Sequence, residues 1–223
     1  MWIKICGNTN LEDAQLAVEA GADAVGFVFA ESPRRVNAAQ VSAITPHLPE
    51  AIEKYGVFVD ASAEEIVRTV KESGLTGVQL HLSHDPSLPS KLREYFGPTL
   101  RILQVVHYAQ NFGTQLEILR QESAIDAVLV DSRTATAVGG TGIRFDWREA
   151  SHSFQDQASR LRLIAAGGLN PANVAEAIRT LQPWGVDVSS GVESAPGRKD
   201  PARVKAFVTA AKAAVAEITA ASR

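Results

Sequence analysis

The sequence has little of several features that would narrow its function at once. It holds one cysteine, Cys6, so it can form no internal disulfide and no zinc site built from several cysteines. No apolar run approaches the roughly 18 to 20 residues that a membrane helix needs. The apolar N-terminal stretch is too short for a signal peptide. We therefore expect a protein of the reducing cytoplasm that makes no contact with a membrane.

Charge of one sign and aromatic residues are also scarce. Charged residues make up 21% of the chain, aromatic residues 6%, and the formal net charge is −3. The two signs are mixed along the sequence, with none of the basic blocks that bind nucleic acids or anionic membranes. The charge pattern therefore argues against a nucleic-acid partner and identifies no other.

What the sequence does have is a regular alternation of short apolar runs and longer helical patterns. At 223 residues and 45% hydrophobic residues, the chain can bury one large core, so we expect a single domain spanning residues 1–223. The expected strands are Trp2–Cys6, Ala22–Phe29, Lys54–Val59, Gly77–His81, Leu100–Val106, Ala127–Asp131, Arg162–Ala166 and Gly185–Ser189. The expected helices are Asn10–Ala20, Ala38–Thr45, Ala63–Glu72, Ser87–Tyr95, Phe112–Gln121, Asp146–Gln157, Pro171–Leu181 and Ala202–Ala220.

Eight such βα units predict an α/β protein with eight parallel strands closed into a (βα)8 barrel, the TIM-barrel fold. An open doubly wound sheet is the main alternative, although it usually needs fewer units. Capping patterns support the helix starts; they are Thr9 with Glu12, Ser62 with Glu65, Asn170 before Pro171, and Asp200 before Pro201.

The barrel prediction directs attention to the residues that follow each strand, because active sites of such barrels lie at the carboxyl ends of the strands. Cys6 ends the first run, before Gly7 and a predicted helix start. Cysteines are frequently inert core residues, but a helix N-terminus would favour the thiolate and lower the pKa of Cys6. Asp131 ends the sixth run, where it can be a turn residue or a functional acid.

Glycine and serine follow the last three strands, an arrangement typical of a phosphate site in these barrels. The candidate phosphate-binding residues are Gly140, Gly142, Gly167, Gly168, Ser190 and Gly191. Such loops bring backbone N–H groups close to an anion, although a glycine-rich loop can also be a plain connection. The pattern favours a phosphorylated small molecule without specifying the reaction.

Three further side chains lie at the predicted catalytic end. Arg34 follows the second strand, where a guanidinium can bind a carboxylate with two hydrogen bonds or simply be solvated. Gln79 and His81 alternate within the fourth strand and so point to the same side. The spacing of His81 and His84 does not amount to a metal site, since no carboxylate cluster accompanies it.

Several segments, in order along nearly the whole chain, resemble the phosphoribosylanthranilate isomerase family. They are Lys4–Gly7, Gly21–Phe29, Ser32–Arg34, Val78–His81, Gly139–Gly142 with Phe145–Trp147, Ala166–Val174 and Val186–Glu193. The resemblance implies an Amadori rearrangement in tryptophan biosynthesis. It converts N-(5-phosphoribosyl)anthranilate, an aminoaldose, into the aminoketose 1-(2-carboxyphenylamino)-1-deoxyribulose 5-phosphate.

The resemblance also implies roles for single residues. Asp131 matches the acid that protonates the ring oxygen of the sugar, and Cys6 matches the base that removes the proton on C2. Arg34 matches the residue that meets the anthranilate carboxylate, and Asp187 is expected to orient sugar hydroxyls or neighbouring groups. Gln79 and His81 are expected to contact the substrate. No cofactor and no metal are expected, because the iminium formed from the substrate is itself the electron sink, and the chain is expected to be a monomer or a homodimer.

One departure from the family pattern is Leu82-Ser83-His84, where the family usually has a glycine after His81. Two other enzymes on the same barrel are alternatives: the aminoaldose isomerase of histidine synthesis, which has a carboxylate in place of Cys6, and indole-glycerol phosphate synthase, which needs lysine acid chemistry. A barrel that binds phosphates without catalysis is the third alternative. Cys6 disfavours the first alternative, the lack of a lysine at the matching strand ends disfavours the second, and the presence of both Cys6 and Asp131 disfavours the third.

Overall fold

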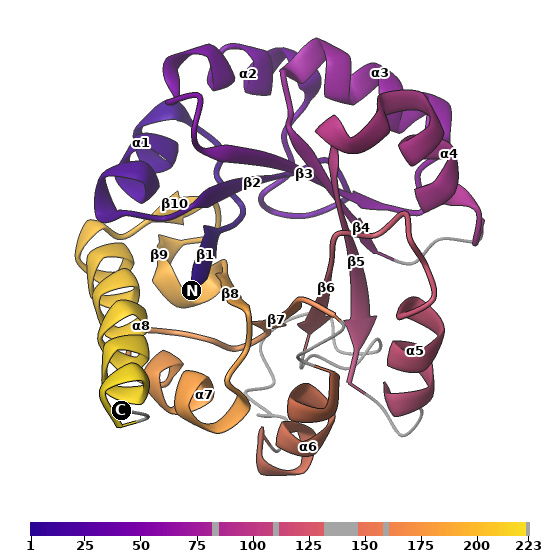
Figure 1. Cartoon of the computed structure of the whole chain (residues 1–223). Coiled ribbons are helices and arrows are strands. Elements are labelled where there is room, and N and C mark those ends of the chain that lie inside the picture. The colour runs from indigo at the N-terminus through magenta and orange to yellow at the C-terminus, as the bar shows by residue number, and fades with distance from the viewer. Residues whose placement is uncertain (82–84, 109–111, 132–146, 158–160, 222–223) are drawn as a thin grey trace.

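The computed structural model describes residues 1–81, 85–108, 112–131, 147–157 and 161–221. Strands lie at the centre and helices surround them (Figure 1). The strands are β1 Trp2–Ile5, β2 Ala24–Val28, β3 Glu53–Val59, β4 Gly77–His81, β5 Arg101–His107, β6 Ala127–Asp131, β7 Leu163–Ala166, β8 Gly185–Val188, β9 Glu193–Ala195 and β10 Arg198–Lys199. The helices are α1 Leu11–Ala20, α2 Ala38–Ser42, α3 Ala63–Ser73, α4 Leu88–Phe96, α5 Phe112–Leu119, α6 Trp147–Gln157, α7 Val174–Leu181 and α8 Pro201–Ala221, and 3₁₀ turns cover Thr45–His47, Gly97–Thr99 and Ser190–Val192.

Strands β1 to β8 form a closed parallel barrel in chain order. The barrel closes where β1 pairs with β8, with Trp2 opposite Gly185 and Ile5 opposite Val188. This closure confirms the predicted TIM-barrel fold and excludes the open doubly wound sheet. Every predicted strand is present within two residues at either end.

Alternation along each strand divides the buried side chains into two groups. In β1, Ile3 and Ile5 belong to the large core between the barrel and its helices, whereas Trp2 belongs to a small cluster inside the barrel. The other members of that inner cluster are Ala24, Tyr55, Leu103, Val105, Ala127, Leu129, Ile164 and Ala166. Because side chains alternate with a period of two, Lys4 and Cys6 point the same way as Trp2, toward the barrel interior.

The helix starts confirm two of the capping predictions. Ser62 accepts a hydrogen bond from the backbone N–H of Glu65, whose side chain accepts one from the N–H of Ser62, so α3 has the predicted capping box. Asp200 accepts from the N–H of Arg203, and α8 begins at Pro201.

Two other capping predictions are wrong. At α1 the cap is Asn10, which accepts from the N–H of Asp13, while the hydroxyl of Thr9 donates to the carbonyl of Gly197 instead. At α7 the helix begins at Val174 and not at Pro171. Thr9 is drawn to a loop distant in sequence, whereas Asn170 accepts from the N–H of Ala172 within a turn that precedes α7.

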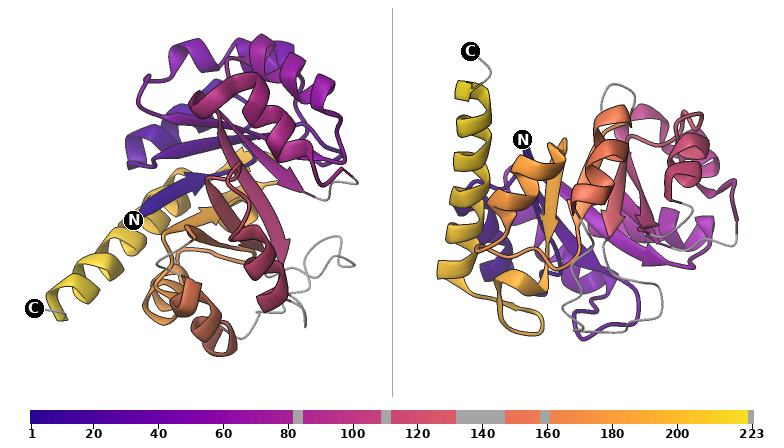
Figure 2. Two further views of the ribbon diagram at one scale, coloured as in Figure 1. Left: turned by 45° about the vertical axis from the view of Figure 1, so that its right-hand side comes forward. Right: turned by 90° about the horizontal axis from the view of Figure 1, so that it is seen from below.

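A short hairpin of β9 and β10, which the alternation did not predict, follows β8. Helix α8 comes next and runs along the outside of the barrel beside α1 and α7 (Figure 2). Lys199, at the end of β10, donates from its backbone N–H to Asp13 of α1. The hairpin is thereby anchored beside the carboxyl end of β1. Within the described ranges, no helix combines the length and the apolar character required to traverse a bilayer.

Candidate active site

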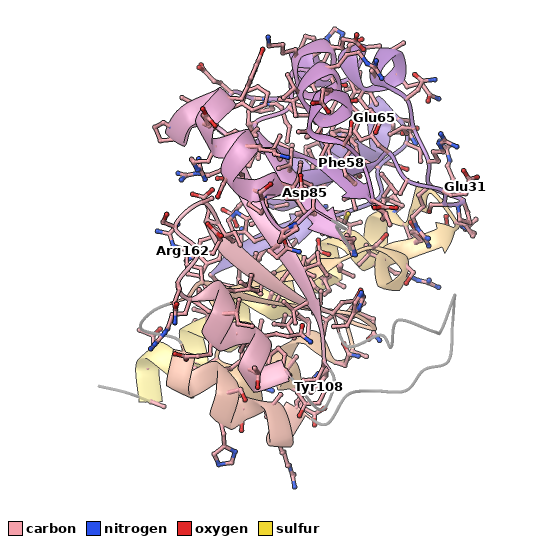
Figure 3. The ribbon with its side chains drawn as sticks, turned by 90° about the vertical axis from the view of Figure 1, so that its right-hand side faces the viewer. Glu31, Phe58, Glu65, Asp85, Tyr108 and Arg162 are labelled. Carbon is pink, nitrogen blue, oxygen red and sulfur yellow. The ribbon has the colours of Figure 1, made fainter. Side chains whose placement is uncertain are left out.

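A cavity of about 220 Å³ opens at the carboxyl end of the barrel. In Figure 3, the labelled residues Glu31 and Tyr108, which follow β2 and β5, mark this end of the barrel. Arg162, just before β7, lies at the opposite end. Side chains at the ends of β1, β2, β3, β4, β6 and β8 and the loops after β2, β7 and β8 line the cavity. The pocket therefore lies where the barrel prediction placed the site.

Most of the predicted site residues line this one cavity: Cys6, Arg34, Gln79, His81, Asp131, Gly167, Gly168, Asp187 and Ser190. Gly140 and Gly142 lie outside the described residues. Gly191 is not among the lining residues, because its Cα packs against the loop after β7, where an added Cβ would lie 1.9 Å from the carbonyl oxygen of Leu169. Close approach of two loops thus explains the glycine at position 191.

Cys6 and Asp131 occupy different arcs of the barrel wall. Cys6 directly follows β1, and Asp131 ends β6, with β7 and β8 between them on the shorter way round. Their side chains are 6% and 2% exposed and both border the cavity. A small molecule held there can meet a thiol on one side and a carboxyl group on the other.

A buried polar chain lies beneath Cys6. The Lys4 ammonium donates to Asp187 Oδ1 at 2.7 Å and to Gln79 Oε1 at 2.8 Å. The amide nitrogen of Gln79 in turn lies 2.8 Å from Nε2 of His81. Asp187 and Gln79, two of the predicted substrate-binding residues, are therefore also partners of Lys4, which has no exposed surface.

The predicted lowering of the pKa of Cys6 is wrong. Burial raises the pKa of the Cys6 thiol above its usual value. The charge of Lys4 opposes this shift, that of Asp187 adds to it, and that of Lys199 opposes it. Desolvation disfavours the charged form of any acid, and here it outweighs the favourable charges. The surroundings of Cys6 in this structure therefore favour the thiol over the thiolate.

Arg34 is held by a partner that the sequence did not reveal. Its Nε and Nη2 donate to the two carboxylate oxygens of Glu193 at 2.8 and 2.6 Å. Lys199 also donates to Glu193, at 2.9 Å, and to the backbone carbonyl of Cys6 at 2.5 Å. Desolvation of Glu193 is outweighed by Arg34 and Lys199, which together lower the pKa of that carboxyl group. The β9–β10 hairpin thus fixes the guanidinium beside the cavity.

The loop after β7 has the backbone expected of an anion site. Gly167 and Gly168 adopt φ of +82° and +65°, values that only glycine accepts readily. Asn173 secures this loop: its side chain accepts from the N–H of Asn170 and donates to the carbonyl of Gly168. Successive backbone N–H groups in such turns form a concave anion-binding surface.

Lys4, Glu193 and Lys199 are the site residues that sequence reasoning missed. A signal existed for Lys4, since a lysine in an apolar strand at an inward position must find a buried partner. Glu193 and Lys199 gave none, because their partners come from the loop after β2 and from β1. Among the described residues, no group of three His, Cys, Asp or Glu side chains could hold a metal ion.

Comparisons with known proteins identify one family. Residues 3–210 match a family described as N-(5'-phosphoribosyl)anthranilate (PRA) isomerase. The N-(5'-phosphoribosyl)anthranilate isomerase of Pelobacter propionicus is 41% identical over 218 residues, which cover 97% of this chain and 98% of that protein. The enzyme of Geobacter sulfurreducens is 42% identical over 213 residues, covering 94% and 98%.

Solved structures are similar as well. Phosphoribosyl anthranilate isomerase from Thermotoga maritima superposes with a TM-score of 0.82 at 36% identity, covering 96% of this chain and 99% of that one. A phosphoribosyl anthranilate isomerase in complex with reduced 1-(o-carboxyphenylamino)-1-deoxyribulose 5-phosphate gives a TM-score of 0.79 with the same identity and coverage. The chain belongs to the N-(5'-phosphoribosyl)anthranilate isomerase family.

Proposed function

We propose that Cys6 and Asp131 make the two proton transfers of the family's reaction, with the substrate lying across the cavity between them. The chain isomerises N-(5'-phosphoribosyl)anthranilate to 1-(2-carboxyphenylamino)-1-deoxyribulose 5-phosphate in tryptophan biosynthesis. The observation that supports these roles is that both side chains border one cavity at the carboxyl end of the barrel.

The first proton comes from Asp131. When it protonates the ring oxygen, the bond from that oxygen to C1 breaks and the lone pair of the anilino nitrogen forms a C1=N iminium. Cys6 as thiolate then takes the proton from C2, and the C–H electrons move toward the iminium nitrogen. The resulting enol becomes the ketone as C1 gains a proton and the C2 hydroxyl loses one, so no proton is gained or lost over the whole isomerisation. The iminium accepts the electrons, so we propose that no cofactor takes part.

Binding relies on local groups, because the net charge of −3 gives no attraction for an anionic substrate. We assign the substrate phosphate to the backbone of Gly167 and Gly168, together with Ser190 and the loop containing Gly140 and Gly142. A relative binds a product analogue that carries such a phosphate.

We assign the anthranilate carboxylate to Arg34, whose guanidinium the bidentate pairing with Glu193 orients at the cavity. Gln79, His81 and Asp187 border the same cavity and would contact the sugar.

The surroundings of the enzyme also belong to the proposal. We place it in the cytoplasm, without a nucleic-acid or membrane partner, as a monomer or a homodimer. A Thermotoga maritima relative is described as dimeric, with monomers obtained from it. The residues from 1 to 223 would form one domain around the barrel.

The test follows the fluorescence of phosphoribosylanthranilate as purified protein consumes it. Wild-type protein should turn the substrate over, and Cys6→Ala should lower kcat by about 10²-fold or more, the usual contribution of a positioned base. A matched Ser42→Ala variant removes a similar small polar atom from the exposed end of α2 and should keep wild-type turnover. Near-wild-type turnover by Cys6→Ala would rule out Cys6 as the base.

A further inference from the structure

Lys4 is a fully buried lysine two residues before the proposed base. We propose that Lys4 is a positioning residue that holds the Cys6 sulfur and stabilises it as the thiolate base. This inference rests on the proposed role of Cys6. Lys4 lies within β1, two residues before Cys6, and therefore on the same inward side. Its side chain is 0% exposed.

The space around Gly26 brings the sulfur and the lysine together. A Cβ at Gly26 would lie 2.6 Å from Cys6 Sγ and 3.1 Å from Lys4 Cε. The missing side chain of Gly26, on the neighbouring strand β2, thus leaves one small volume that both side chains fill. The ammonium is fixed there by Asp187 on one side and Gln79 on the other. Its position relative to the sulfur is therefore set by three strands.

The charges around the sulfur explain why a lysine is needed. Lys4 comes from β1, Asp187 from β8 and Lys199 from β10, and all three act on the pKa of Cys6. Burial alone would lower the pKa of Lys4, but the charges of Asp187 and Cys6 outweigh it and raise that pKa. Lys4 therefore stays protonated, and its single positive charge is shared between the carboxylate and the sulfur. Without it, ionised Cys6 would add a second negative charge to a buried carboxylate.

The proton balance of the step is simple. Cys6 loses a proton to solvent to become the thiolate, then takes the C2 proton of the substrate and becomes a thiol again. Lys4 keeps its proton throughout and forms no bond to the substrate. Its contribution is electrostatic, and it should appear in the titration of Cys6 before any substrate is bound.

Two variants compare the sulfur with and without the charge of Lys4, each in the absence of the Asp187 carboxylate. Asp187→Asn keeps the shape of the side chain and removes its charge, and Lys4→Met/Asp187→Asn removes both charges. Because Cys6 is the only cysteine, the ultraviolet absorbance of its thiolate, corrected with Cys6→Ala protein, reports this one group. Circular dichroism checks that each variant is folded.

The two variants should differ in the titration midpoint of Cys6. Asp187→Asn should lower it relative to wild type, because Lys4 then acts on the sulfur alone. The double variant should lie above Asp187→Asn by about one pH unit or more, a typical effect of one adjacent charge on a buried group. The rise of kcat/KM with pH in the wild type should follow the wild-type midpoint.

Lys54→Met is the matched control. Lys54 is also a buried lysine in a barrel strand, but its ammonium donates to the carbonyls of Pro49 and Ile52. Its loss should leave the Cys6 midpoint unchanged. Equal midpoints in Asp187→Asn and the double variant would overturn the role of Lys4, whatever the activities. Failure of Cys6 as base shows instead in the turnover of Cys6→Ala, so the two failures are separable.

Discussion

The two ends of the barrel interior are built from the same strands but differ in chemistry. The end at which the strands begin holds Trp2, Tyr55 and Ile164, which pack as an apolar cluster. The end at which they finish holds Lys4 and Asp187 beneath the cavity, where they are buried as an ion pair. One step of two residues along β1, from Trp2 to Lys4, passes from one chemistry to the other.

The two ends should contribute differently to stability and to catalysis. Apolar side chains in the inner cluster contribute to stability by burial alone. Buried charges contribute little net stability, because desolvation offsets most of their attraction. Their arrangement instead sets the protonation of Cys6 and the position of Arg34. We therefore expect substitutions at the apolar end to change stability and substitutions at the polar end to change kinetics.

The largest expected effect lies at the polar end. Asp131→Asn keeps the shape of the side chain but removes the acid, so kcat should fall by about 10²- to 10⁴-fold, the range for a general acid. Its thermal unfolding temperature should stay close to that of the wild type. Turnover of phosphoribosylanthranilate and a circular dichroism melt measure the two effects. A strong loss of stability with intact turnover would contradict the comparison.

The apolar end should show the reverse. Ile164→Ala leaves a cavity in the inner cluster and should reduce the free energy of unfolding by about 2 to 5 kcal/mol. The kcat of the folded variant should change little. Urea unfolding measures the loss, and Ile118→Ala is the control, since Ile118 on α5 is 65% exposed and its truncation removes almost no packing. Equal stability of the two variants would show that the inner cluster is not tightly packed.

A smaller effect should separate binding from proton transfer within the polar end. Glu193→Gln weakens the bidentate hold on Arg34, so KM should rise by about 3- to 10-fold, less than the loss of a direct charged hydrogen bond would cause, with a smaller change in kcat. Glu217→Gln is the matched control, because Glu217 also binds an arginine, Arg179, but on the exposed face of α8. An unchanged KM in Glu193→Gln would show that Arg34 needs no support from the hairpin.

Much of the scaffold was predictable because its signals are local. The apolar runs placed the eight barrel strands, and the closed barrel then put Cys6, Asp131 and Arg34 at one cavity. Helix starts were less predictable, since Thr9 matches a capping pattern but bonds the distant Gly197 instead. A local sequence pattern does not reveal a competing hydrogen-bond partner that lies near the other end of the chain.

The protonation of Cys6 likewise could not be predicted from local sequence. Its position before a helix start predicted a lowered pKa, whereas burial raises that pKa in the folded chain. Desolvation depends on how many atoms surround the sulfur, and those atoms come from several strands. The same holds for Glu193, whose role appears only when the hairpin folds back onto Arg34.

The sequence by itself therefore determined the barrel, the end at which the cavity opens and the family, because alternation and motif order are carried by neighbouring residues. Only the tertiary structure decided which charges share a buried space. Lys4 and Asp187 are separated by nearly the whole chain, yet closure of the barrel between β1 and β8 brings their charged atoms to 2.7 Å. Electrostatic interaction depends on distance and burial, and neither can be read from separation along the chain.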